Sequence, residues 1–87
     1  MDAWVPIAGL QGKVVDAERS YSVAVEGIER PDGTWAGRLV FLDGKSLRIT
    51  DEETSQPSRD ALVYWASGLE PIYLEGAFQR ARATAIA

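Results

Sequence analysis

Residues 21–50, YSVAVEGIERPDGTWAGRLVFLDGKSLRIT, determine the fold of this 87-residue chain. Two groups of turn residues, Pro31-Asp32-Gly33 and Asp43-Gly44, separate its apolar runs. Proline, glycine and aspartate suit the backbone angles of tight turns. The stretch therefore predicts three antiparallel strands over residues 21–29, 34–42 and 45–50.

The turns also predict the register of these strands. A two-residue type I′ turn at Asp43-Gly44 places Val40 opposite Leu47. A four-residue loop that pairs Glu29 with Thr34 places Val23 opposite Val40. Both registers agree on one common face, which we expect to be the core: Tyr21, Val23, Val25, Val40, Leu42, Leu47 and Ile49.

The reverse face of the predicted sheet is also apolar. It carries Trp35, Leu39 and Phe41 beside Ile28, although an antiparallel sheet commonly has one polar face. We expect these side chains to be covered, either by the amino-terminal segment or the final strand of the same chain or by a second copy in a symmetric homodimer. Base stacking on the aromatic residues is disfavoured, because the neighbouring charges are acidic.

The segments outside this meander predict one further strand and a helix. Residues 10–17 are expected to form the first strand, with Val14 opposite Val23. Residues 57–67 have Pro57 at a first-turn position and apolar side chains at helical spacing, so they predict a helix that covers the sheet. Ser55 or Gln56 is its expected cap.

The last segment, residues 71–87, has two interpretations. The preferred one is a strand, because Gly76 is unfavourable inside a helix and small residues alternate with larger ones after it. The alternative is a second helix that begins at Pro71. The predicted class is thus α+β, in a single domain spanning residues 1–87: a four-stranded antiparallel meander, one helix packed on the sheet and a C-terminal strand.

The composition excludes several kinds of chemistry. The chain has neither His nor Cys, which removes the usual proton shuttle at neutral pH, thiol nucleophiles and the common transition-metal ligands. We therefore expect no catalytic residue, no metal and no cofactor. The lack of Cys fits a reducing cytoplasm. The net charge of −4 makes nucleic acid an unfavourable partner, and no apolar run is long enough to cross a membrane.

Two charged groups are candidate sites. The run Asp51-Glu52-Glu53 has the ligand type that hard cations prefer, but a solvated run leading into the helix explains it better. Arg80 and Arg82, on one face of a strand and about 7 Å apart, form a candidate anion-binding pair. Charges that protect an edge strand from association explain these two arginines equally well.

These features favour a non-enzymatic binding or assembly module in the cytoplasm that acts as a homodimer or with a protein partner. The predicted interaction surface comprises Ile28, Trp35, Leu39, Phe41 and the half-exposed Tyr64. The alternative is a small anionic-ligand or nucleic-acid-binding domain that uses the two C-terminal arginines. A third class, an enzyme working through paired carboxylates such as Asp51 and Glu53, has no reaction that can be named.

Overall fold

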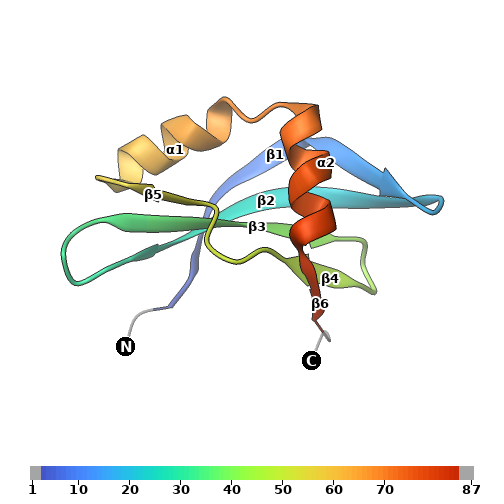
Figure 1. Cartoon of the computed structure of the whole chain (residues 1–87), viewed down its shortest axis with the longest axis horizontal. Coiled ribbons are helices and arrows are strands. Elements are labelled where there is room, and N and C mark those ends of the chain that lie inside the picture. The colour runs from blue at the N-terminus through green and yellow to red at the C-terminus, as the bar shows by residue number, and fades with distance from the viewer. Residues whose placement is uncertain (1–2, 85–87) are drawn as a thin grey trace.

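The computed structural model describes residues 3–84. Within this range the chain is an antiparallel sheet with two helices, so the predicted α+β class is confirmed (Figure 1). The elements in chain order are β1 (Val5–Asp16), β2 (Arg19–Glu29), β3 (Trp35–Leu42), β4 (Leu47–Ile49), β5 (Thr54–Gln56), α1 (Arg59–Ser67), α2 (Pro71–Arg80) and β6 (Arg82–Thr84).

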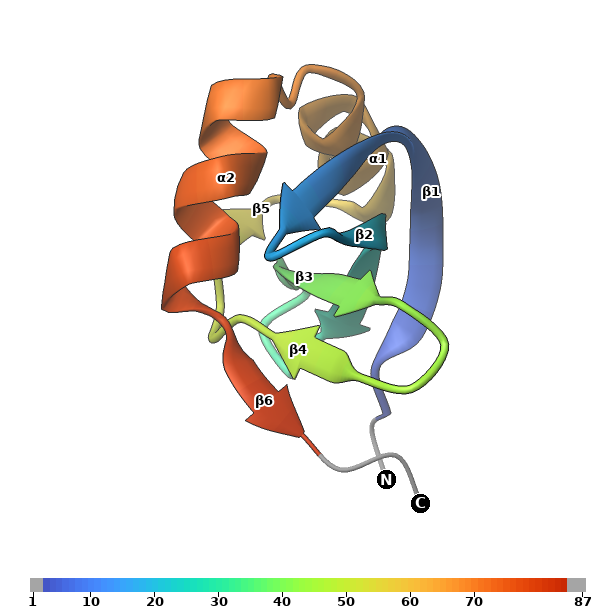
Figure 2. The same ribbon diagram turned by 90° about the vertical axis from the view of Figure 1, so that its right-hand side faces the viewer.

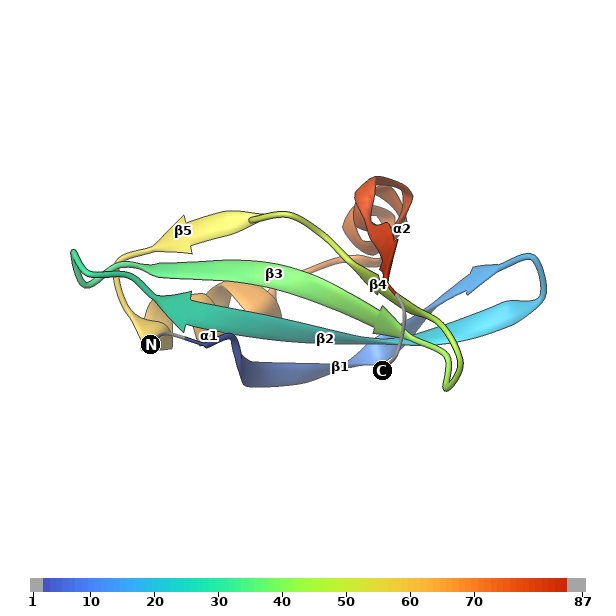
Figure 3. The ribbon, with the colours of Figure 1, turned by 90° about the horizontal axis from the view of Figure 1, so that it is seen from below.

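The strand order is β1-β2-β3-β4-β6, and β5 pairs with the beginning of β3. All of these pairings are antiparallel, and the sheet is open rather than closed into a barrel. The last turn of α2 leads directly into β6, which lies beside β4 at one edge (Figure 2). Seen from below, the strands lie in front of α1, so the opposite face of the sheet is turned away from that helix (Figure 3).

The register between β2 and β3 differs from the prediction by one residue. Val23 lies opposite Phe41, not opposite Val40. A slip of one residue moves every side chain of a strand to the other face. Leu39 and Phe41 therefore point into the core, while Val40 and Leu42 point away from it.

A longer loop than predicted causes this slip. Glu29 pairs with Trp35, which leaves residues 30–34 in the connection. The Arg30 amide donates to the Thr34 carbonyl at 2.8 Å, and the Asp32 carboxylate accepts from the Thr34 amide and hydroxyl at 2.9 and 2.6 Å. These bonds stabilise the five-residue form, and they lower the pKa of Asp32.

The other two hairpins differ from the prediction by two residues, which leaves the facing of the side chains unchanged. Val40 pairs with Ile49, because residues 43–46 form a four-residue loop whose amides donate to the Asp43 carboxylate. Val14 pairs with Tyr21 instead of Val23. β1 is also longer than predicted, with irregularities between Pro6 and Ala8 and between Leu10 and Lys13.

The C-terminal segment combines both interpretations, since residues 71–80 are helical and only residues 82–84 form a strand. Pro71 begins α2, and Leu74, Ala77 and Phe78 form its buried stripe. Burial of this stripe outweighs the cost of Gly76 in a helix, which is about 1 kcal/mol.

The first helix begins later than predicted. Residues 54–56 form β5 instead of a polar link, so α1 is capped by the Ser58 hydroxyl, which accepts from the Ala61 amide at 3.1 Å.

Phe78 joins α2 to the centre of the sheet. Its ring lies 4.8 Å from the Tyr21 ring and 5.2 Å from the Phe41 ring, the latter edge to face. The Arg48 guanidinium stacks on it at 4.6 Å. Because the three contacts come from β2, β3 and β4, one side chain ties the second helix to three strands.

Leu62 of α1 fits into a slot made by two glycines. Gly27 and Gly37 are direct cross-strand partners in β2 and β3. A Cβ atom at either position would lie only 2.6 Å from a methyl carbon of Leu62, and at Gly27 also 2.9 Å from Ile7. The missing side chains therefore let α1 approach the sheet closely.

We expect Gly27→Ala to lower the free energy of unfolding by about 1–3 kcal/mol, because the added methyl group overpacks the slot. The measurement is chemical denaturation. Gly9→Ala is the control, since a Cβ at Gly9 meets nothing within 4 Å. In the double variant with Leu62→Ala, the glycine substitution should cost less, because room has been made for it. Parent-like stability of Gly27→Ala would contradict the tight slot.

Candidate functional site

The structure does not bring the predicted interaction surface together. Leu39 and Phe41 are completely buried beneath the helices, and Trp35 is half-buried against the same core. Ile28 points to the opposite face, whereas Tyr64 is 81% exposed on α1. The prediction of an aromatic docking face is therefore wrong. Leu39 and Phe41 are covered by the same chain, but α1 and α2 provide the cover instead of the amino-terminal segment or a final strand.

A different sheet face is left without cover by the helices. We call it the outer face, and its apolar part is formed by the cross-strand pairs Val40–Ile49 and Leu42–Leu47 together with Ala24. None of the five belongs to the core cluster or packs against it. Leu42 is 42% exposed and the others are half-buried. This is the face toward the viewer in Figure 3.

The other end of the outer face carries a cation and an aromatic ring. Arg38 donates from Nε and Nη2 to Glu26 Oε1 at 2.9 and 2.8 Å. The Arg38 guanidinium also stacks on the Trp4 ring at 4.2 Å. The segment before β1 thus covers this end, so the apolar part lies toward the β3–β4 loop.

The acidic run is solvated at Asp51 and Glu52 but not at Glu53, and its carboxylates are not arranged around a common centre. Asp51 pairs with Arg82, Glu52 with Arg30, and Glu53 with Arg80. Each carboxylate thus binds a guanidinium from a different element. Within residues 3–84 no cluster of three or more acidic, His or Cys side chains is placed to hold a metal ion.

The two C-terminal arginines lie in different elements and bind different carboxylates. Arg80 is the last residue of α2, and Arg82 is the first residue of β6, so they do not share the face of one strand. The predicted geometry of the anion site is wrong for this reason. Each guanidinium is already bound to a carboxylate of its own chain.

Glu53 is the centre of a small polar cluster. Its side chain is only 9% exposed and accepts from the Tyr73 hydroxyl at 2.7 Å and from Arg80 Nη2 at 2.5 Å. The Trp65 ring packs edge to face on Tyr73 at 6.1 Å. Burial, and then the hydrogen bond and charge of Glu53, raise the pKa of Tyr73 to about 12. The phenol is therefore a neutral donor at physiological pH, which suits a structural contact.

We expect one tyrosine of the folded protein to titrate near pH 12 in absorbance at 295 nm. A phenol whose pKa rises from 10.0 to about 12 on folding stabilises the fold fully below pH 10 and loses this contribution between pH 10 and 12. Tyr73→Phe should remove the late transition, and Glu53→Gln should shift it to lower pH.

Tyr64→Phe is the control for this titration, because it removes an exposed phenol on another helix. Persistence of the late transition in Tyr73→Phe would contradict its assignment.

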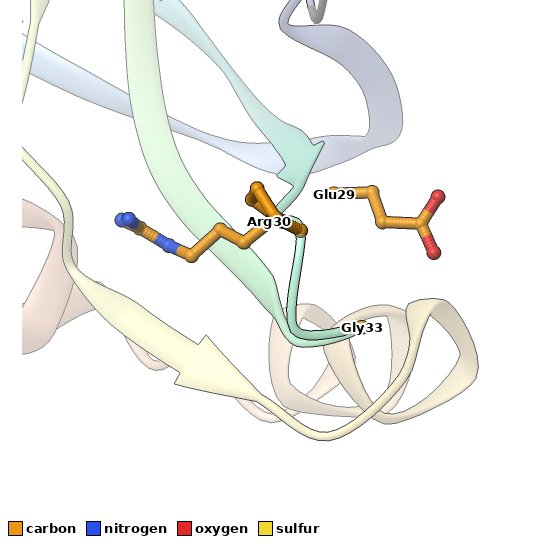
Figure 4. Close-up of a pocket in the computed structure, with 4 residues that line it drawn as sticks. Glu29, Arg30 and Gly33 are labelled. Atoms are coloured by element: carbon orange, nitrogen blue, oxygen red, sulfur yellow. The ribbon is translucent and has the colours of Figure 1, made fainter.

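The hollows in the described part of the surface include one at a loop and one beside β1. One lies at the β2–β3 loop, where the charged groups of Glu29 and Arg30 point in opposite directions near Gly33 and form no converging site (Figure 4). The other, which we call the junction pocket, lies where the middle of β1 meets the connection between the helices. Its lining residues are Gly9, Leu10, Gln11, Gly12, Ala66, Ser67, Leu69, Pro71 and Leu74.

Sequence reasoning missed both the outer face and the junction pocket. The apolar side chains of Val40, Leu42, Leu47 and Ile49 were predicted to share a face with Val23 and Val25 of β2, whereas they lie on the opposite face. The length of the β2–β3 loop is the feature that decides between these two arrangements. Gly9 and Gly12, a residue type that weakens the interior of a strand, lie in the pocket wall.

Comparison of the chain with protein-family models, curated proteins and solved structures finds no match. No helix within residues 3–84 has the length and apolar character needed to cross a membrane.

Proposed function

We propose that this chain is a non-enzymatic assembly module that forms a symmetric homodimer through the apolar part of the outer face. The observation that supports this proposal most directly is the position of Val40, Leu42, Leu47 and Ile49, which form two adjacent cross-strand pairs outside the core. Partly exposed apolar side chains grouped on one face are a common feature of association surfaces.

The geometry of a sheet suits such a pairing. Two sheets stack face to face about 10 Å apart, with side chains from both faces interdigitating. In a two-fold dimer the same patch is used twice, so an apolar patch is complementary to itself. In such a dimer the helices of each copy would lie on the side of its sheet away from the interface, where they do not obstruct contact.

The charges around the outer face also favour a second copy over an anion. The chain has a net charge of −4, which by itself opposes association. Near this face, however, Arg38 pairs with Glu26 and Arg82 pairs with Asp51. A second copy would therefore face arginines whose charge is neutralised by carboxylates of the same chain. A phosphate would have to compete with these carboxylates for the two guanidinium groups. The absence of Cys supports action in the reducing cytoplasm.

We expect the parent protein to be a dimer in light scattering across a dilution series, and Leu42→Asp to be a folded monomer. Leu42 is exposed enough to tolerate the substitution, but a carboxylate there would be buried without a partner in the interface. Ile72→Asp, on α2 and 78% exposed, is the matched control because it adds the same charge away from the sheet. It should remain dimeric.

Two outcomes would refute the proposed homodimer. One is a parent protein that is monomeric at every concentration. The other is equal disruption by Leu42→Asp and Ile72→Asp, which would show that added charge, rather than the outer face, controls association.

A further inference from the structure

The junction pocket is a formed cavity with a volume of about 300 Å³. Its walls come from β1 on one side and from the end of α1 and the start of α2 on the other. Leu74 and Ala66 are buried in the core and reach the pocket from the helices. The pocket therefore extends the apolar interior to the surface at the edge of the sheet.

The chemistry of the lining selects a neutral occupant. Leu10, Leu69 and Leu74 provide apolar walls, and Gln11 and Ser67 are polar but uncharged. No charged residue lines the pocket within the described chain, although 25% of the sequence is charged. A carboxylate, phosphate or ammonium group would lose its hydration there without gaining an ionic partner.

The backbone of β1 beside the pocket lacks a strand partner. Leu10 pairs with Val23 and Lys13 pairs with Ser22, so Gln11 and Gly12 between them have no register partner in β2. β1 is an edge strand, and in residues 3–84 no strand pairs with its other side. Gln11 and Gly12 are exposed, and exposed peptide groups at the edge of a sheet can hydrogen-bond to an extended peptide.

We propose that the junction pocket binds one leucine-sized side chain of an extended segment from a partner protein, while the main chain of that segment hydrogen-bonds to Gln11 and Gly12. The volume is at the lower limit for small-molecule sites, which fits one large side chain better than a nucleotide or flavin. An apolar pocket can hold the side chain of one residue of a peptide, and the peptide groups beside the pocket can hydrogen-bond to the main chain of the same residue. The site lies on the helix side of the sheet and is independent of the outer face.

The test is an NMR titration of the uniformly ¹⁵N-labelled protein with the capped peptide acetyl-Gly-Leu-Gly-amide. We expect saturable shifts of the amide signals of Gly9, Gly12, Ser67 and Leu69. The same peptide with Ala in place of Leu should bind about tenfold more weakly or worse, because it buries three fewer carbons. Isopentanol, which has the side chain but no peptide groups, should bind more weakly than the leucine peptide.

Two variants of β1 provide a comparison. A Cβ at Gly12 would lie 3.7 Å from Leu74 Cδ1, an ordinary contact, so Gly12→Ala adds a methyl group to the pocket wall and narrows the pocket. Val15 is 71% exposed and does not line the pocket, so Val15→Ala is the control. We expect Gly12→Ala to weaken binding of the leucine peptide severalfold and Val15→Ala to change it less than twofold.

Several results would overturn the proposal. Equal affinity for the leucine and alanine peptides would show that the pocket takes no side chain. Equal or tighter binding of isopentanol would indicate a site for small apolar molecules. Repeating the titration in Leu42→Asp separates the two proposals, because the pocket should bind equally well when the outer face carries a charge. The comparison of peptides in the parent protein remains decisive even if Gly12→Ala does not fold.

Discussion

The loop of residues 30–34 determines which side of the sheet becomes the interior. Its hydrogen bonds, centred on the Asp32 carboxylate, fix five residues between β2 and β3. With one residue fewer, Leu39 and Phe41 would face away from the helices. Phe78 would then lose its edge-to-face contact, and the glycine slot would no longer face Leu62. The position of both helices thus depends on a short polar turn at the end of the sheet.

The local features of the fold were predictable from the sequence. Alternating apolar residues and turn groups indicated the four strands of the meander, and helical spacing indicated α1, because these patterns depend on neighbouring residues. The registers were not predictable with the same certainty. Asp43 and Asp32 each stabilise a longer loop through side-chain hydrogen bonds to backbone amides. These are Asx-turn bonds, from a backbone amide to the aspartate carboxylate two residues earlier, and loop lengths based on backbone turn types alone do not include them.

The site could be predicted less well than the fold, because its contacts join residues far apart in the sequence. The pairing of Glu53 with Tyr73 and Arg80 spans 20 and 27 residues, so no local pattern indicates it. Tyr64, expected to be half-exposed, is 81% exposed. The junction pocket depends on a two-residue irregularity in β1, and glycine content alone does not distinguish such an irregularity from a weak strand.

The three ion pairs of residues 51–53 have a consequence for the order of assembly of the chain. Arg30 precedes the carboxylates in the sequence, whereas Arg80 and Arg82 follow them by 27 and 31 residues. A ribosome that synthesises the chain from its amino terminus therefore completes the meander while two of the three carboxylates still lack their guanidinium partners. The link between sheet and helices becomes fully anchored only when residues 80–82 have also left the exit tunnel.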